Sequence, residues 1–386
     1  MLFQALDNKR ECYKIFCDSA LHDDYISEDL THTWAPTHHF HSQEVEYASL
    51  WCSGKSLEEV CPEHLKARLQ IVTDKAKVFV KTFYNAKINL DDVCFYDLVP
   101  EKFLMDYYEV KNQITQHVFE NFEKPKNYDF LLNLILFLKD IEGRELSVDK
   151  SQVADLDGSE KLSSNDNKIY YNPWKAVTGR LTTNKNSFPI LTLNKELRSA
   201  IKPNNDVFLE LDYNSAELRV LLGLLGQKQP PEDLHEWIRK NVFDDKLERE
   251  KSKIKTFAWL YNPESKNKKL NAFFDRNKIL DKFYKNGFVE TPYGRKIRCD
   301  SDKALNYMIQ STSSDMLLTS ALNVAKILQD KKSFVSFCIH DSIVIDLSLE
   351  DKALVDDLRN LFSDTLFGKL KTNVSLGKDF GNMRKV

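Results

Sequence analysis

The 386-residue sequence predicts a mixed α/β chain of the α+β kind, built on an antiparallel sheet with helices around it. Two stretches indicate sheet. Residues 207–219, VFLELDYNSAELR, change from a strand pattern to a helix pattern, and residues 333–347, SFVSFCIHDSIVIDL, contain two β-prone runs joined by a tight turn. Helical spacing at residues 249–261 supplies the third observation.

The first of these stretches places Asp212 where a strand gives way to a helix. Asn214 or Ser215 is expected to be the N-cap of that helix. A carboxylate at the exposed end of a strand is well placed to hold a divalent metal, because the sheet fixes its direction. The alternative is an Asp that only caps the strand-to-helix turn.

The second stretch is expected to form a hairpin whose turn is His340-Asp341-Ser342, with Asp341 at its tip. Asp212 and Asp341 are far apart in sequence but would both lie at strand ends. Two such carboxylates are what a pair of metal ions needs to drive in-line phosphoryl displacement.

The helix expected at 249–261 carries Arg249, Lys253, Phe257 and Tyr261 at intervals of four residues, which forms one slanting ridge. Two cations followed by two aromatic rings match a nucleoside triphosphate, because cations meet phosphates and rings meet sugar and base. An ordinary amphipathic helix is the alternative, with a core face that includes Ile254 and Ala258 beside the two rings.

These motifs resemble those of family A DNA polymerases, the bacterial DNA polymerase I family. DYNSAELR is similar to the first catalytic motif, IHDSIVID to the third, and the ridge to the fingers helix. The resemblance implies a right-hand polymerase fold with an antiparallel palm sheet, helical fingers and thumb, and a small N-terminal domain. It implies a template-directed DNA polymerase that uses two Mg²⁺ ions held by Asp212, Asp341 and the Tyr213 carbonyl.

The same resemblance assigns contacts to other residues. Arg249 and Lys253 would hold the triphosphate, with Phe257, Tyr261 and His235 beside it, and Glu217 would exclude a ribose 2′-hydroxyl. Contacts with primer–template DNA fall to residues in the TGRL, GFVETPYGRKIR, LNYMIQ and His-Asp-Ser motifs: Arg180, Arg295, Asn306, Gln310 and His340. Gln310 would donate to minor-groove acceptors that every base pair presents.

Two departures from the family pattern bear on function. Ser342 replaces the usual Glu after His340-Asp341, and His-Asp-Ser also occurs in the related single-subunit phage-type RNA polymerases. RNA synthesis is therefore one alternative, and a catalytically inactive DNA-binding replication accessory protein is another. Asn262 stands where the family has Gly, and Asn is expected to keep the left-handed turn there.

The predicted parts are an N-terminal domain at 1–100, a thumb at 101–180, palm at 181–230 and 296–386, and fingers at 231–295. The N-terminal part is faintly similar to a 3′–5′ exonuclease domain, but Asn89 stands where a metal-binding Asp is expected. The Asp-x-Glu pair of the first exonuclease motif is also missing, because Asp18 is followed by Ser19 and Ala20. An inactive remnant is therefore expected. Strands are predicted at 13–17 and 77–83. A zinc site is the alternative for the His and Cys residues of this region, which are Cys12, Cys17, His22, His32, His38, His39, His41, Cys52 and Cys61.

Composition fits a globular enzyme, with 42% hydrophobic and 29% charged residues and a net charge of −3. Basic residues concentrate between Arg239 and Arg298, which is where a nucleic acid partner would bind. The seven cysteines form no CxxC pair and predict reduced thiols in a cytoplasmic compartment, or in a nucleoid or host cytoplasm if the chain is viral. No membrane is expected, and a processivity or replisome partner is left open.

Overall fold

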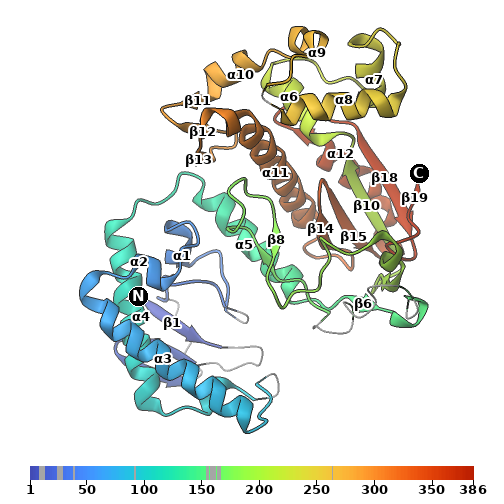
Figure 1. The fold of residues 1–386 in the computed structure, drawn as a ribbon. Helices are drawn as coiled ribbons and strands as arrows, with labels where there is room; N and C mark the ends of the chain where they lie inside the picture. Colours follow the sequence, from blue (N-terminus) through green and yellow to red (C-terminus); the bar gives the residue numbers. More distant parts are fainter. Residues whose placement is uncertain are drawn as a thin grey trace. The chain divides into compact units, whose positions relative to one another are not determined.

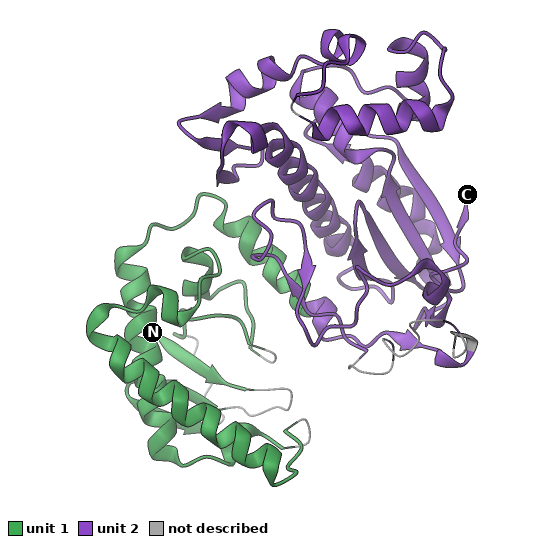
Figure 2. Ribbon diagram, viewed as in Figure 1, with its two compact units in different colours: residues 1–139 green, residues 140–386 purple. Residues whose placement is uncertain are grey.

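The computed structural model describes residues 1–386 apart from 8–13, 24–28, 38–39, 91–92, 154–155, 157–161, 163–166 and 263, and describes only the backbone of 152–153. The described chain divides into two compact units, Met1–Lys139 and Asp140–Val386 (Figure 2). Each unit has its own elements, labelled in Figure 1.

Unit 1 combines a small antiparallel sheet with two long helices. The sheet has the order β1 (Phe3–Leu6), β2 (Lys14–Cys17) and β3 (Ala20–Asp23), and the helices are α3 (Glu63–Asn85) and α4 (Glu101–Asn121). The predicted strand at 13–17 is thus confirmed for its described residues. The shorter elements are β4 (His32–Thr33), β5 (Glu46–Tyr47), α1 (Ala48–Trp51), α2 (Leu57–Val60) and a 3₁₀ turn at Phe95–Asp97, and α5 (Tyr128–Glu142) follows at the unit's C-terminal end.

The strand predicted at 77–83 is wrong, because these residues form the C-terminal part of α3. The run VFVKTF is β-prone by composition, yet Phe79 and Phe83 are four residues apart and pack against the same core, with their rings stacked at 6.3 Å. Tertiary packing of a helical face therefore overrides local preference.

The core of unit 1 runs across residue 100. Buried residues of β1, β2 and α3, such as Leu6, Phe16 and Leu69, share one cluster with Ile114 and Val118 of α4. Val110, Ile114 and Val118 recur every four residues along α4 and form its buried side. The division of the chain into N-terminal domain, thumb, palm and fingers stays a prediction. Helix α4, which falls in the predicted thumb, packs in the same core as residues 1–100.

Unit 2 is organised around a five-stranded antiparallel sheet in the order β14-β15-β10-β18-β19. The strands are β14 (Phe334–Ile339), β15 (Ser342–Leu347), β10 (Val207–Tyr213), β18 (Thr372–Gly377) and β19 (Arg384–Lys385). The α+β class and the antiparallel sheet built from the two predicted stretches are confirmed.

The register of the strands determines which residues lie next to Asp212. Asp212 is opposite Ser342 on one side and Asn373 on the other, and the β14–β15 turn consists of His340 and Asp341. Within β10, Leu209, Leu211 and Tyr213 are buried while Glu210 and Asp212 alternate with them. Period-2 alternation therefore gives the sheet one apolar face and one face with carboxylates.

Helices α11 (Ser301–Ile327) and α12 (Val355–Ser363) pack with the sheet, and α6 (Ala216–Leu224) packs against α11 (Figure 1). Tyr213 shows how: its ring stacks on Phe362 of α12 at 4.3 Å, and its hydroxyl donates to Ser320 of α11 at 2.7 Å. Both helices thereby hold the strand end that carries Asp212.

Four helices form the segment between α6 and α11. They are α7 (Leu234–Asn241), α8 (Arg249–Tyr261), α9 (Lys268–Phe273) and α10 (Arg276–Phe283), followed by the three-stranded sheet of β11 (Tyr284–Lys285), β12 (Phe288–Glu290) and β13 (Lys296–Arg298). The remaining short elements of unit 2 are β6 (Ser147–Val148), β7 (Tyr171–Asn172), β8 (Thr182–Thr183), β9 (Ile201–Lys202), β16 (Asp364–Thr365), β17 (Gly368–Lys369) and 3₁₀ segments at Lys150–Val153, Lys195–Ala200 and Leu349–Leu354.

Helix α8 contains the whole predicted ridge from Arg249 to Tyr261, and its buried side is not the one that the amphipathic alternative requires. Ile254 is 66% exposed and Ala258 is exposed, whereas Trp259 is fully buried. The other buried residues of α8 are Ser252, Thr256 and Leu260. The ridge of cations and rings is therefore not the core face of this helix.

Several smaller expectations are also decided. Cys94 is disulfide-bonded, so the prediction that every cysteine is reduced is wrong, although Cys17, Cys52, Cys61, Cys299 and Cys338 are free. Part of the zinc alternative (Cys12, His38 and His39) lies outside the described residues. Among the residues that are described, no group of three or more His, Cys, Asp or Glu is suited to a metal ion. No helix in the described part of the chain is long and apolar enough to cross a bilayer.

Candidate active site

Two carboxylates lie together at one end of the large sheet in unit 2, with a third on the same face, and the three side chains alone do not form a group suited to a metal ion. Asp212 is at the end of β10, Glu210 is two residues earlier on the same face, and Asp341 is at the tip of the β14–β15 hairpin. The backbone N–H of Tyr213 donates to the Asp341 carbonyl at 3.3 Å, which ties the hairpin tip to the end of β10. His340 has a φ of 51°, and this left-handed residue makes the two-residue turn possible.

Burial raises the pKa of each of these three carboxylates. The pKa of Asp341 is raised to about 6, mainly by burial and also by the negative charges of Glu217 and Asp212, while Arg180 lowers it. Burial likewise raises the pKa of Asp212, although Asn373 donates to its Oδ2 at 2.9 Å and opposes the rise. The pKa of Glu210 is also raised, mainly by burial.

The residues present fit a divalent metal. Carboxylate and backbone carbonyl oxygens are the hard ligands that Mg²⁺ prefers, and Asp212, Asp341 and the Tyr213 main chain supply them side by side. A bound dication would also remove the repulsion that raises the Asp341 pKa, since opposite charge favours the ionised carboxylate. The donor set and its electrostatics therefore suit the ions that the sequence predicts.

This repulsion leads to a first prediction, that Asp341→Asn is more stable than the wild type in EDTA at pH 7.5. The folded pKa of about 6 exceeds the usual Asp value, so the stability that this carboxyl contributes is present at low pH and lost as pH rises from about 4 through 6. The expected gain is about 2 kcal/mol in free energy of unfolding, measured by urea denaturation.

The gain should shrink as pH falls to 5, and Mg²⁺ should stabilise the wild type but not the variant. A variant that is less stable than the wild type at every pH would contradict the proposed repulsion.

Glu217, in the first turn of α6, is buried at 6% exposure and holds two partners. The hydroxyl of Tyr261 on α8 donates to Glu217 Oε2, and the Arg180 guanidinium pairs with Oε1. Burial raises the pKa of Tyr261, and the contact with Glu217 raises it further, so the phenol stays a donor. Glu217 therefore links α6, α8 and the Arg180 segment next to Asp341.

The ridge of α8 is arranged with both rings together. The rings of Phe257 and Tyr261 stack at 6.1 Å, and the His235 ring lies 5.5 Å from that of Phe257. Burial lowers the pKa of His235 to about 4, a shift that Asp233 opposes and the cations Arg249 and Lys253 reinforce, so the imidazole is neutral at pH 7.

Asp233 holds Arg249 in place, a role that sequence reasoning missed. The Arg249 guanidinium donates to both carboxylate oxygens of Asp233, at 2.9 and 3.3 Å. Asp233 is also the N-cap of α7 and accepts from the Glu236 N–H at 2.9 Å. Burial opposes ionisation of Asp233, yet these hydrogen bonds keep its pKa well below the usual value.

A second missed group is formed by Asn214 and the fully buried Arg219. Asn214 Oδ1 accepts from the Leu234 N–H at 3.0 Å, and its Nδ2 donates to Asp233 at 3.0 Å. Arg219 donates to the carbonyls of Asn214, Pro230 and Glu232, at 2.7, 2.9 and 2.9 Å. These bonds fasten the start of α7 to the residues that follow Asp212.

The predicted N-cap of α6 is confirmed in position, because Ser215 occupies it with a φ of 60°. Its side chain makes no capping bond, and the Asn214 side chain bonds to Leu234 and Asp233. The expected left-handed Asn262 is wrong, because its φ is −105°. Pro263 lies outside the described residues.

The TGRL segment packs beside the hairpin tip. Arg180, His340 and Asp341 line a cavity of about 200 Å³ together with residues of α11, among them Ser314. Ser314 donates to the Gly179 carbonyl at 2.9 Å. Burial lowers the pKa of His340, and two nearby arginines lower it further.

Arg295, which is predicted to contact DNA, is bonded within unit 2. Its guanidinium pairs with the buried Asp315 of α11 at 2.6 Å and lies against Gly179, where a Cβ atom would come within 2.4 Å of the guanidinium carbon. Gly179 also has a φ of +74°, so no other residue fits there without strain. Arg295 therefore braces the segment that presents Arg180.

The last two predicted DNA contacts, Asn306 and Gln310, lie on α11. Gln310 donates to Asn306 at 3.0 Å, one helical turn away.

Ser342, which stands where the family has Glu, lies beside a carboxylate of the neighbouring strand. Its hydroxyl oxygen is 3.1 Å from Glu210 Oε1 and 3.1 Å from the Ile339 carbonyl oxygen, and its one proton is donated to one of them.

In sequence, this chain is similar to several known DNA polymerases. No protein-family model matches the chain. DNA polymerase I of Lactococcus lactis subsp. lactis (strain IL1403) is 26% identical over 257 residues, which are 52% of this chain and 29% of that protein. The DNA polymerase of Mycobacterium phage D29 is 26% identical over 220 residues, 47% of this chain and 36% of that protein.

The thermostable DNA polymerase I of Thermus aquaticus is 23% identical over 264 residues, 54% of this chain and 32% of that protein. The matched part is thus about a third of the length of these relatives. A solved structure described as the POL domain of Pol1 from M. smegmatis in complex with DNA primer-template and dNTP has a TM-score of 0.49, at 16% identity over 82% of this chain and 66% of that chain.

Proposed function

We propose that this chain, a relative of the bacterial DNA polymerase I family (family A), is a template-directed DNA polymerase that adds deoxynucleotides to a primer 3′ end. The observation that carries the proposal is the register that sets Asp212 beside the Asp341 hairpin tip, with the α8 ridge tied to the same strand end. Its substrates are primer–template DNA and dNTPs.

Asp212 and Asp341, with the Tyr213 carbonyl, would hold two Mg²⁺ ions. When bound, such ions lower the pKa of the primer 3′-hydroxyl and stabilise charge at the phosphorus. The hairpin bond from Tyr213 to Asp341 keeps the two carboxylates in register while substrates exchange. Asn373 fixes one oxygen of Asp212, which leaves the other to face a ligand.

The α8 ridge supplies the nucleotide contacts in this proposal. Lys253 and Arg249 attract the triphosphate, and Arg249 would exchange its bond with Asp233 for phosphate oxygens. A neutral His235 donates a hydrogen bond without adding charge. The stacked rings of Phe257 and Tyr261 offer flat apolar surface to sugar and base.

On the DNA side, Arg180 and His340 line the cavity next to Asp341 and are assigned to the primer end, while Asn306 and Gln310 on α11 are assigned to the minor groove. Arg295 acts indirectly, through Gly179. Contacts of this kind read backbone and shape, so affinity should depend on salt and little on sequence.

Primer extension on a primed template with Mg²⁺ and the four dNTPs tests the proposal directly. Products should lengthen one nucleotide at a time and stop at the template end. A purified chain that binds primed DNA without extending it would favour the accessory-protein alternative, and extension with NTPs alone would favour the RNA polymerase alternative. The three curated DNA polymerases among its relatives favour the DNA enzyme.

Proofreading is predicted to be absent. Asp18 lies in the exposed turn between β2 and β3, and Asn89 stands where a metal-binding Asp is expected. With Mg²⁺ and a 5′-labelled single strand, we expect no shortening from the 3′ end on a denaturing gel. Steady release of 3′ nucleotides that persists in Asp212→Asn would show an active nuclease in unit 1.

A cytoplasmic location, or host cytoplasm for a viral chain, belongs to the proposed function.

A further inference from the structure

The C-terminal end of α8 is held by a residue of another helix. Asn262, the C-cap, has φ and ψ of −105° and 105°, so the chain leaves α8 in an extended direction. A left-handed residue at this point would fold the chain back onto the last carbonyls of the helix. Because Asn262 is extended, those carbonyls need hydrogen-bond donors from a different segment.

Arg276, the first residue of α10, supplies such donors. Its guanidinium donates to the Asn262 carbonyl at 3.0 Å and also to the Trp259 carbonyl. The guanidinium carbon lies 4.0 Å from the centroid of the Trp259 ring, which is a cation–π contact. A cation at a helix C-terminus also complements the helix dipole. One side chain therefore fixes the backbone at the end of α8.

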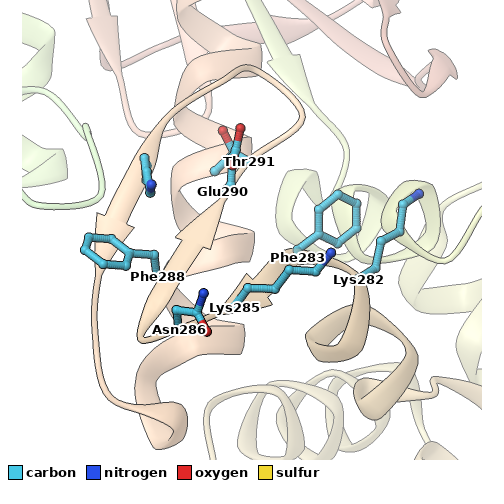
Figure 3. Close-up of a pocket in the computed structure, with 8 residues that line it drawn as sticks. Lys282, Phe283, Lys285, Asn286, Phe288, Glu290 and Thr291 are labelled. Carbon is cyan, nitrogen blue, oxygen red and sulfur yellow. The ribbon is translucent and has the colours of Figure 1, made fainter.

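Both sides of this contact are firmly held. Trp259 is fully buried, and its indole N–H donates to Asn271 of α9 at 2.6 Å. Helix α10 buries Ile279 and packs with α11. Figure 3 shows the other end of α10, where Phe283 leads into the β11–β12 hairpin. Arg276 therefore joins α8 to a helix that is anchored along its length.

Tyr261 lies between the two carbonyls that Arg276 holds. Its side chain is 41% exposed, so core packing does not fix it as it fixes Trp259. Its hydroxyl donates to Glu217, and its ring stacks on that of Phe257. The direction in which Tyr261 leaves the helix therefore depends on the backbone that Arg276 fixes.

We propose that Arg276 is a positioning residue for nucleotide selection, which fixes the end of α8 so that Tyr261 stays bonded to Glu217. The inference rests on the proposed polymerase function. Arg276 acts through Tyr261, because its guanidinium is engaged with backbone carbonyls and lies over a buried ring. A direct contact between Arg276 and a DNA phosphate is the alternative, and it predicts a different result.

The test is a double-mutant cycle between Arg276→Gln and Tyr261→Phe, with kcat/KM for dCTP and CTP measured on one primed template. Arg276→Gln should lower the preference for dCTP by about fivefold, with kcat for dCTP within about twofold of the wild type. Because both changes break the same tether, the double variant should lose about tenfold, as Tyr261→Phe does alone. Independent effects would instead multiply to about fiftyfold.

Two further variants complete the comparison. Arg276→Lys keeps the cation but not the planar pair of donors, and should lower the preference by about threefold. Arg359→Gln removes the same charge from an exposed position on α12 and is the matched control, which should keep the preference of the wild type.

Wild-type selectivity in Arg276→Gln, or a loss of about fiftyfold in the double variant, would overturn the inference. So would a salt dependence of primer–template binding that falls by about one phosphate contact in Arg276→Gln, since Arg276 would then bind DNA. Should Arg276→Gln melt below the assay temperature, Arg276→Lys decides, and wild-type selectivity in that variant overturns the inference.

Primer extension by the wild type separates this inference from the proposed function. A wild type that does not extend a primed template refutes the proposed polymerase. Normal extension by every variant, together with unchanged selectivity in Arg276→Gln, refutes only the role of Arg276.

Discussion

Asp212→Asn is expected to slow single-nucleotide primer extension by at least about a thousandfold, which corresponds to about 4 kcal/mol of lost transition-state stabilisation. The amide is the same size and can still accept the Asn373 hydrogen bond, so β10 should keep its register. What it lacks is the negative charge that a metal ligand at this strand end needs. Rapid-quench measurement of kcat with saturating dNTP measures the effect.

Primer–template affinity in EDTA should remain within about twofold of the wild type, because DNA binding depends on phosphate and groove contacts rather than on this carboxylate. Asp330→Asn, at an exposed turn after α11, is the matched control and should extend primers normally. An Asp212→Asn enzyme with more than a tenth of wild-type kcat would remove Asp212 from catalysis.

Local sequence patterns predicted the elements of the site well. The strand that ends at Asp212, the hairpin tip at Asp341 and the ridge of α8 follow from alternation, β-propensity and helical spacing, all of which act over a few residues. These signals are strong because buried and exposed positions alternate clearly.

These local patterns do not predict contacts between side chains that are far apart in sequence. Asn214 has the side chain of a good N-cap, and nothing nearby in sequence says that its amide bonds to Leu234 and Asp233 instead. Arg219 follows a helical pattern that suits a surface residue, yet it is fully buried among backbone carbonyls. The burial of Arg295 against Asp315 is of the same kind, since only the fold brings them together.

Sugar selection is the second large effect expected. Glu217 is nearly inaccessible and is held by the Tyr261 hydroxyl and the Arg180 guanidinium, so its carboxylate is a rigid wall rather than a mobile side chain. In the proposed function this wall occupies the space of a ribose 2′-hydroxyl. A buried misfit of a few kcal/mol gives the wild type a preference of about a thousandfold for dCTP over CTP in kcat/KM.

Three variants distinguish the effect of the volume of the Glu217 side chain from the effect of the position of its carboxylate. Glu217→Ala removes the wall and should raise kcat/KM for CTP by about a hundredfold, with dCTP little changed. Glu217→Gln keeps the volume and should retain most of the selectivity. Tyr261→Phe keeps the ring stack with Phe257 but removes one hydrogen bond to Glu217, and should relax the preference by about tenfold.

Single-nucleotide kinetics with dCTP and CTP on one primed template measure all four enzymes. The order wild type, Glu217→Gln, Tyr261→Phe, Glu217→Ala in falling selectivity follows if a fixed carboxylate excludes the hydroxyl. If Tyr261→Phe matched the wild type, Glu217 would act by volume alone, without its tether. Near-equal use of CTP and dCTP by the wild type would instead make His340-Asp341-Ser342 the better guide and point to an RNA-synthesising enzyme.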